Sequence, residues 1–351
     1  MSPHHLFRRL AIVCALLGAL WGTAAVGALC VGTFLVSPAQ VVRILGDPAL
    51  ATVVDAPDPT LVGVGQQARI IWDIRLPRVV LASLVGAALA MAGVALQGML
   101  RNPLADPYIV GTSSGAALGA AIAIVLGLSS GFDTAWPARP LFSFLGALLT
   151  MAFVVRLSRI DGRLPVDTFL LAGVVAGSFL WALVSFVMAT SQGHMKEIVF
   201  WLMGDLSLAS WPMVKMVAPY LLGAAVALML TSHRLNLLSM GEESASALGV
   251  DVEATKLAVV VFASLLTGAA VSVSGLIGFL GLFVPHILRT LSGPDHRVLL
   301  PASALGGAVF LLVADTAARL MSPLELPVGV LTALCGGPFF FVLLRRRLES
   351  L

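Results

Sequence analysis

The chain has 351 residues, of which 59% are hydrophobic and 11% are charged, and its mean hydropathy is +1.00. An average soluble domain carries about 25% charged residues, and a water-soluble fold could not hide this much apolar surface, so the composition excludes an ordinary soluble enzyme or binding domain. The net charge of +3 comes from basic residues scattered at the ends of apolar runs, not clustered on one aromatic-rich face, so we expect no nucleic acid as a partner.

Apolar stretches of about 20 residues, enough to cross a bilayer core of about 30 Å as a helix, recur along the whole chain. The first follows Arg8 and Arg9 and is too long for a cleaved signal peptide. Leu81–Leu100 is apolar on every face, which excludes alternating β-strands. We therefore predict an all-α integral membrane protein with a single domain over residues 1–351. Its ten predicted spans are residues 10–36, 76–100, 106–128, 140–158, 166–190, 212–232, 254–273, 275–291, 298–321 and 327–345.

The distribution of Lys and Arg predicts the orientation of these spans. A cytoplasmic N-terminus puts most of the 21 basic residues inside, as the positive-inside rule requires. Two external segments, residues 37–75 and 191–211, are then longer than simple turns. The second contains Trp201 and Trp211, for which interfacial anchoring is favoured over contact with a ligand.

Residue patterns that carry catalysis or hold metals are scarce. Cys14, Cys30 and Cys335 lie in apolar runs without C-x-x-C spacing, so neither a disulfide framework nor a metal site is predicted. No G-x-x-x-x-G-K-[ST] phosphate loop and no H-E-x-x-H motif occurs. We expect no catalytic residue and no bound cofactor in this chain. If ATP drives its function, a separate ATPase subunit must bind the ATP and its Mg²⁺.

The segment Arg101–Pro107 interrupts the apolar pattern with two prolines, two charged residues and an amide, so it cannot continue a helix through hydrocarbon. It predicts an ordinary inner turn or, less favoured on physical grounds alone, a gate in which Asn102 and Leu104 close the inner end of a pathway. Glycines four residues apart follow on one helix face and predict close contact with another helix. They are Gly111, Gly115 and Gly119.

Residues 235–250 are too polar for a span and too long for a turn. Two sets of residues share helix faces in this segment: Leu235, Leu238 and Glu242, and then Ala245, Leu248 and Val250. This pattern predicts two short amphipathic helices joined at Gly241. Such a segment could lie on the lipid surface or enter a groove of a partner protein. Anionic lipid would repel Glu242 and Glu243, which favours a protein partner.

Titratable side chains in the last third of the chain raise the alternative of a proton relay through His286, Asp315 and Glu325. Asp315 and Arg319 lie four residues apart on one predicted helix, a spacing that allows an ion pair. The relay is disfavoured because Asp315 would then already have a partner and because His286 lies at an inner boundary.

In these segments the sequence resembles the permease subunits of iron-siderophore, haem and cobalamin importers, the membrane components of type II ABC uptake systems. The matching motifs run in order through nearly the whole chain. They are Arg75–Arg78, Gly86–Gln97, Arg101–Pro107, Gly111–Gly119, Leu171–Val174, Trp201–Gly204, Met240–Gly249, Gly278–His286, Asp295–Arg297, Ala314–Arg319 and Glu325–Gly329.

The resemblance implies a ten-helix permease with the type II ABC importer fold in a bacterial inner membrane. The implied partners are a second permease copy in a homodimer, two cytoplasmic ATPase subunits and a periplasmic or extracellular substrate-binding protein. ATP would close the ATPases and move the coupling helices, and rocking of the two permeases would open a central cavity alternately to each side. The cargo implied first is an iron(III)-siderophore, with cobalamin and haem as alternatives.

The resemblance also assigns roles to residues of the matching motifs. Three outer arginines would pair with glutamates of the binding protein, and the coupling helices at about residues 235–250 would fit a groove of the ATPase. Asn102 and Leu104 would form the cytoplasmic gate, which overturns the preference for a plain turn, and the fifth span, residues 168–190, would line the pathway. The arginines are Arg75, Arg78 and Arg319, and the coupling residues are Gly241, Glu242, Ala247, Leu248 and Gly249.

Two rival functions come from other classes. An ion-driven secondary transporter would be expected to carry charged residues at midspan in broken helices, and most of the predicted spans lack them. A structural scaffold would not need a docking segment such as Met240–Gly249. Co-purification of an ATPase discriminates among the three. Within the importer reading, Trp181 and His194–Lys196 fall outside the motifs, and we expect cargo choice to reside at such variable positions.

Overall fold

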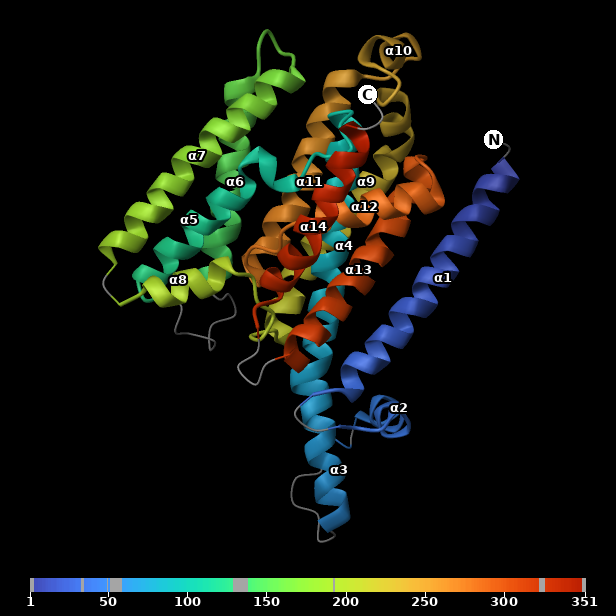
Figure 1. Ribbon diagram of the computed structural model, residues 1–351, viewed down its shortest axis with the longest axis vertical. Coiled ribbons are helices and arrows are strands. Elements are labelled where there is room, and N and C mark those ends of the chain that lie inside the picture. Colours follow the sequence, from blue (N-terminus) through green and yellow to red (C-terminus); the bar gives the residue numbers. More distant parts are fainter. Residues whose placement is uncertain are drawn as a thin grey trace.

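The computed structural model describes residues 3–32, 35–48, 50, 59–128, 138–191, 193–321 and 326–348. Within these ranges the chain is almost entirely helical, and the only β pairing is an isolated bridge between Ile160 and Arg163. Figure 1 shows long helices running between two ends of the molecule. The short helix α10 and the start of α1 lie towards one end, whereas α2 and α3 lie at the other.

Each of the ten predicted spans coincides with a helix, and the predicted all-α membrane fold is confirmed. Among the described residues, seven helices are long and apolar enough to cross a membrane: α1 (Pro3–Cys30), α4 (Leu76–Met99), α6 (Ala138–Ser158), α7 (Val166–Thr190), α9 (Trp211–Leu238), α11 (Val252–Ser274) and α13 (His296–Met321). Three shorter helices take the remaining places: α5 (Thr112–Val125), α12 (Leu280–Ser292) and α14 (Val328–Leu348).

The two long external segments carry helices of their own. These are α2 (Pro38–Gly46), α3 (Pro59–Arg69), the π-helical turn η2 (Ile70–Arg75) that joins α3 to α4, and α8 (Met195–Leu202) after α7. The indole N–H of Trp211 donates to the carbonyl of Trp72 at 2.8 Å, and that of Trp72 donates to the carbonyl of Ile44 at 3.2 Å. The outer ends of α9, η2 and α2 are therefore joined by tryptophan hydrogen bonds.

Helix α4 forms the centre of the bundle, and nearly all of its side chains are buried. Glycine lets neighbouring backbones approach it closely. A Cβ added to Gly86 would contact the carbonyl oxygen of Gly307 on α13, and one added to Gly93 would contact that of Gly281 on α12. These contacts leave no room for a side chain, so α4, α12 and α13 pack backbone against backbone.

The predicted glycine contact face on α5 is confirmed. A Cβ added to Gly115 would contact Thr150 and the carbonyl of Gly146 on α6, and one added to Gly119 would contact the carbonyl of Phe142. Figure 1 shows α5, α6 and α7 lying together beside the rest of the bundle.

Two of the predicted spans begin with irregular backbone. The span expected at residues 275–291 is helical only from Leu280, because Gly275 ends α11 with φ +65° and Phe279 also has a positive φ of +65°. The span expected from residue 106 begins with the 3₁₀ turn η3 (Pro107–Val110), and α5 starts only at Thr112. Both predictions placed the helix start too early.

The prediction of two short amphipathic helices over residues 235–250 is half wrong. Leu235 and Leu238 belong to the last turns of α9, where both are buried, so the expected first helix is the end of a membrane-spanning helix. The chain breaks at Gly241, whose φ is +121°, and a single short helix follows, α10 (Glu242–Ala247). Burial against neighbouring helices extends α9 beyond the point where polarity alone would end it.

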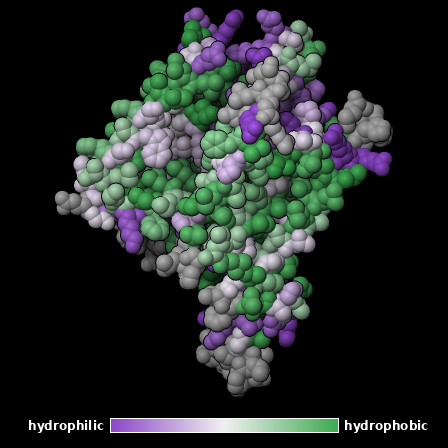
Figure 2. Space-filling view, in the orientation of Figure 1, coloured by the Kyte–Doolittle hydropathy of each residue, from purple (hydrophilic) through white to green (hydrophobic). Residues whose placement is uncertain are grey.

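Hydropathy divides the surface into bands. Figure 2 shows hydrophobic residues, in green, over the middle of this face, with hydrophilic residues, in purple, gathered mainly towards the two ends. Exposed apolar side chains include those of α7, among them Phe179 at 64% and Phe186 at 65% exposure. An apolar band between two polar ends is the surface expected of a protein that crosses a bilayer.

The close backbone packing of α4 is testable with Gly86→Ala. The new Cβ would meet the Gly307 carbonyl, and we expect a loss of about 1–3 kcal/mol of stability, measured as a lower melting temperature in detergent. Gly223→Ala on α9 is the matched control, since an added Cβ meets nothing within 4 Å there and helix propensity favours alanine by up to about 1 kcal/mol. Equal melting temperatures for the two variants would contradict this packing.

Candidate functional site

An ionic cluster of three residues lies at the outer ends of α4 and α13. The guanidinium of Arg78 donates to both carboxylate oxygens of Asp315 at distances of 2.9 to 3.1 Å. Arg319 Nε lies 3.4 Å from Asp315 Oδ2, which confirms the ion pair predicted from their four-residue spacing. The two members of the Arg78–Asp315 pair are 7% and 1% exposed, so this is a buried salt bridge that joins two helices 237 residues apart in sequence.

Arg75 and Arg319 hold the end of α1. Arg75 Nη1 donates to the carbonyl of Leu29 at 2.5 Å, and Arg319 Nη2 lies 3.4 Å from the carbonyl of Ala28. Gly32 makes room for this, because a Cβ there would lie 2.6 Å from Arg75 Nη2. Arg75 and Arg78 are therefore buried rather than displayed on the outer surface. Their role in docking a binding protein stays a prediction, and an incoming carboxylate would have to compete with Asp315 for Arg78.

The two irregular segments meet each other inside the bundle. The hydroxyl of Tyr108 donates to the carbonyl of Ile277 at 3.0 Å and accepts from its N–H at 3.1 Å. Backbone polar groups at membrane depth must find partners within the protein, and Tyr108 supplies both for Ile277.

Two motifs that are distant in sequence meet the segment before α12 at this point. A Cβ on Gly204 would contact the carbonyl of Leu276, one on Gly275 would contact that of Trp201, and one on Gly329 would contact that of Met203. The N–H of Gly329 donates to the carbonyl of Gly204 at 3.2 Å. The motifs Trp201–Gly204 and Glu325–Gly329 were read separately from the sequence, and the fold brings their ends together at Gly275 and Leu276. Glu325 itself lies outside the described residues.

Gln97 organises the inner end of α4. Its amide nitrogen donates to the carbonyls of Ala105 and Gly281, both at 3.2 Å, and its oxygen accepts from Arg289 Nη2 at 2.7 Å. The buried amide thus fixes the Arg101–Pro107 segment to α12. This role of Gln97 was not predicted, although a lone amide in an otherwise apolar helix was the available sequence signal.

The two predicted gate residues lie in a tight turn after α4. Asn102 is exposed, and its side-chain oxygen accepts the N–H of Leu104 at 3.0 Å, while Leu104 is half-buried. Arg101 adopts a φ of +50°. Asn102 therefore sets the position of Leu104, but the gating role of both residues stays a prediction.

Helix α7, predicted to line the pathway, is buried along one side only. A Cβ added to Gly173 would lie 2.6 Å from the carbonyl of Ile109, so this side packs against η3. Exposed apolar side chains occupy much of the rest of its surface: Leu171, Val174, Val175, Phe179, Trp181 and Phe186. This surface is available to lipid, to a pathway or to another subunit.

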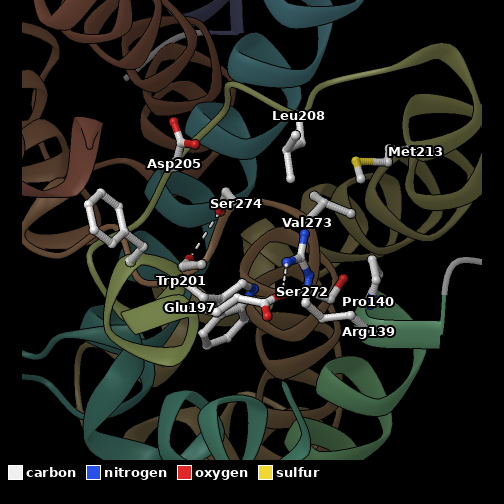
Figure 3. A pocket seen from close by; sticks show the side chains of 12 residues that line it. Arg139, Pro140, Glu197, Trp201, Asp205, Leu208, Met213, Ser272, Val273 and Ser274 are labelled. Atoms are coloured by element: carbon white, nitrogen blue, oxygen red, sulfur yellow. Dashed lines mark hydrogen bonds and ion pairs between the residues drawn. The ribbon is translucent and has the colours of Figure 1, made fainter. Parts of the chain in front are cut away.

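A cavity of about 240 Å³ lies at the outer end of the molecule, between α6, α8, α9 and α11. Figure 3 shows Arg139 and Glu197 joined by a dashed line, with Trp201 and Ser272 close to them. Arg139 Nη1 lies 3.5 Å from Glu197 Oε1, so this ion pair attaches α8 to the start of α6. The cavity combines one guanidinium, two carboxylates and aromatic rings, and its lining residue Glu197 directly follows His194–Lys196, where cargo choice was predicted.

On the inner face, α10 presents the predicted coupling residues. Ala245 is buried, whereas Met240 and Leu248 are 68% and 61% exposed. A groove of about 760 Å³ runs beside α10, and its lining includes Arg163, Glu242, Glu243, Ser246, Ala247, Val250, Asp251 and Glu253. Exposed apolar side chains next to an acidic groove are suited to a protein partner and would be unfavourable on an anionic lipid surface.

The proton relay gains no support. Asp315 is engaged by two arginines, the ring of His286 packs against Phe339 with centroids 5.7 Å apart, and Glu325 lies outside the described residues.

The comparisons with known proteins agree with this architecture. The model of the FecCD transport family matches residues 7–346. The chain belongs to the FecCD transport family. FecCD relatives include the cobalamin import system permease protein of Halobacterium salinarum, 46% identical over 82% of this chain and 77% of its own length. Another is the hemin transport system permease protein of Yersinia pestis, 44% identical over 80% and 84%.

A solved structure of a metal-chelate type ABC transporter in an inward-facing conformation superposes with a TM-score of 0.80. It is 33% identical and the match covers 98% of this chain and 100% of that one. These findings confirm the FecCD permease fold and the ABC importer permease predicted from the sequence. As a FecCD permease, the chain is a multi-pass membrane protein that works with an ATPase and a substrate-binding partner.

The buried salt bridge of this FecCD permease is testable with Asp315→Ala. Removing the carboxylate takes away the ion-pair partner that Arg78 and Arg319 share. We expect about 3–5 kcal/mol of destabilisation, read from thermal unfolding in detergent. Arg297→Ala is the control, because Arg297 Nη2 also forms an ion pair, 2.6 Å from Asp295 Oδ2, but is 43% exposed, and an exposed pair contributes about 1 kcal/mol or less. A loss at Asp315 no larger than at Arg297 would refute the structural role.

Proposed function

We propose that this chain is the permease of an ATP-driven importer that moves a metal chelate across a bacterial inner membrane by alternating access. The observation that carries the proposal is the family match over residues 7–346, together with a fold that follows a metal-chelate transporter over nearly its whole length. The chain forms one permease domain over residues 1–351 and binds no cofactor or metal of its own.

The first-choice cargo is an iron(III)-siderophore. The cobalamin and hemin relatives carry, by name, a metal held in an organic chelator, and iron(III)-siderophores belong to the same chemical class and are the commonest cargo of such importers. Cobalamin is the second candidate, favoured by the 46% identity to the cobalamin permease, and haem is the third.

The proposed assembly is a homodimer of this permease with two ATPase subunits and a periplasmic or extracellular binding protein. The ATPases hold and hydrolyse the ATP with Mg²⁺, so this chain is not itself an enzyme. They dock at Met240, α10 and Leu248, where exposed apolar side chains adjoin the acidic groove. A second copy meets the exposed apolar side of α7, so that the pathway runs between the copies.

The binding protein docks at the outer end near Arg75, Arg78 and Arg319, which lie together at the outer ends of α4 and α13. Glutamates of the partner would accept charge-assisted hydrogen bonds from these guanidinium groups, which are among the strongest available at an interface.

Uptake into membrane vesicles tests the function. Vesicles that contain this chain, its ATPase and its binding protein should accumulate labelled iron(III)-siderophore only when ATP is present inside. Labelled cobalamin is run in parallel. Uptake of cobalamin alone would replace the siderophore as cargo, whereas uptake that ignores ATP and follows an ion gradient would overturn the importer.

The gate is tested separately with Leu104→Ala. Shortening this side chain should open the inner constriction and raise ATP-independent leak of cargo several-fold, measured as efflux from loaded vesicles. Leu291→Ala is the control, since Leu291 lies at the inner end of α12 and is 71% exposed. Equal leak from the two variants would remove Leu104 from the gate.

A further inference from the structure

A buried lysine at the inner end of the bundle contacts three separate elements. Lys256 lies in the first turns of α11 and its side chain is only 2% exposed. Its ammonium lies 2.9 Å from Glu242 Oε2 and 2.8 Å from Glu253 Oε1, and it donates to the carbonyl of Leu164 at 3.0 Å. An ammonium group has three donors, so the three contacts can use all of them. We call Lys256, Glu242, Glu253 and the Leu164 backbone the Lys256 clamp.

The clamp fixes the inner end of α7. The N–H of Leu164 donates to Glu253 Oε2 at 2.7 Å, so both polar backbone groups of Leu164 are held by side chains of α11. Leu164 is buried and precedes the start of α7 at Val166 by two residues. The start of α11 is itself fixed, because Asp251 caps it by accepting the N–H of Ala254 at 2.9 Å. The beginnings of α7 and α11 are therefore bound together.

The clamp also reaches α10 through Glu242, the first residue of that helix. Glycines with positive φ lie on both sides of α10, Gly241 at +121° and Gly249 at +83°. Such positions allow a short helix to turn relative to its neighbours. In the described part of the chain, the Lys256–Glu242 bond is the ion pair that ties α10 to α11 across this pair of hinges.

We propose that Lys256 is a coupling residue, which passes displacement of α10 to the inner end of α7. This inference rests on the proposed function, in which an ATPase docks on α10 and α7 lines the pathway. A buried ammonium is strongly destabilised when it loses its partners, so α10 cannot move far from Lys256 without drawing the clamp with it. Without the Glu242 contact, movement of α10 would be absorbed at the two glycines and would not reach Leu164.

The discriminating variant is Glu242→Gln, which removes one charge from a side chain that is 38% exposed and leaves the Lys256–Glu253 pair in place. Glu243→Gln is the matched control for cargo moved per ATP, because Glu243 is the next residue of α10 and lines the same groove but forms no ion pair in the described structure. Weaker docking of the ATPase at this groove lowers uptake and hydrolysis together and leaves their ratio unchanged. Each variant is reconstituted with the ATPase and the binding protein. Uptake of labelled iron(III)-siderophore and release of phosphate from ATP are then measured in the same vesicles.

We expect Glu242→Gln to retain the ATPase and its hydrolysis while cargo moved per ATP falls at least about fivefold, the lower end of typical coupling between sites. Glu243→Gln should keep the wild-type ratio, and Glu242→Asp, which keeps the carboxylate, should recover part of it. Amide hydrogen exchange over residues 160–167 should match the wild type in Glu242→Gln, since Leu164 stays bound to Glu253 and Lys256.

Three outcomes would overturn the inference, and they are distinct. An unchanged ratio in Glu242→Gln, with ATP-dependent uptake by the wild type, would overturn the coupling role alone. Wild-type uptake that ignores ATP would overturn the proposed function and the coupling role with it. Faster amide exchange over residues 160–167 in Glu242→Gln would show that Glu242 merely supports the fold, and would also refute the inference.

Discussion

The structure depends on one constraint, which is that polar backbone groups inside a bilayer must be paired within the protein. Regular helices meet it without help, but the segments before α5 and α12 do not. There Tyr108 pairs with both backbone groups of Ile277, and Gln97 takes the carbonyls of Ala105 and Gly281. Two side chains thus allow irregular backbone inside the bundle, where glycines bring the surrounding chain segments into contact.

Buried charged side chains are likewise paired within the protein at the two ends of the molecule. At the outer end Asp315 forms ion pairs with Arg78 and Arg319, and at the inner end Glu242 and Glu253 form ion pairs with Lys256. Each cluster joins elements that are distant in sequence, and each lies where a partner protein is proposed to dock. Each cluster therefore connects a proposed docking surface to helices in the core.

The sequence predicted those features that depend on neighbouring residues. Apolar length located the ten spans, the prolines of Arg101–Pro107 located the break after α4, and the four-residue spacing of Asp315 and Arg319 predicted their ion pair. It missed features decided by tertiary contact. The Arg78–Asp315 bridge spans 237 residues, the late start of α12 depends on Tyr108, and the extension of α9 to Leu238 depends on burial that the polarity of the segment conceals.

Helix α4 does not end at the membrane surface, because η2 continues it without a loop into α3, and Figure 1 shows α3 projecting beyond the other helices. At about 1.5 Å per residue, residues 59–75 add on the order of 25 Å of rod outside the predicted span. The rod has a fixed length and position, since α4, which continues it into the bundle, packs against α12 and α13 through glycine contacts. A molecule bound at its tip would therefore lie at a fixed height above the bilayer. A sideways force on the tip would act on α4 at the centre of the bundle.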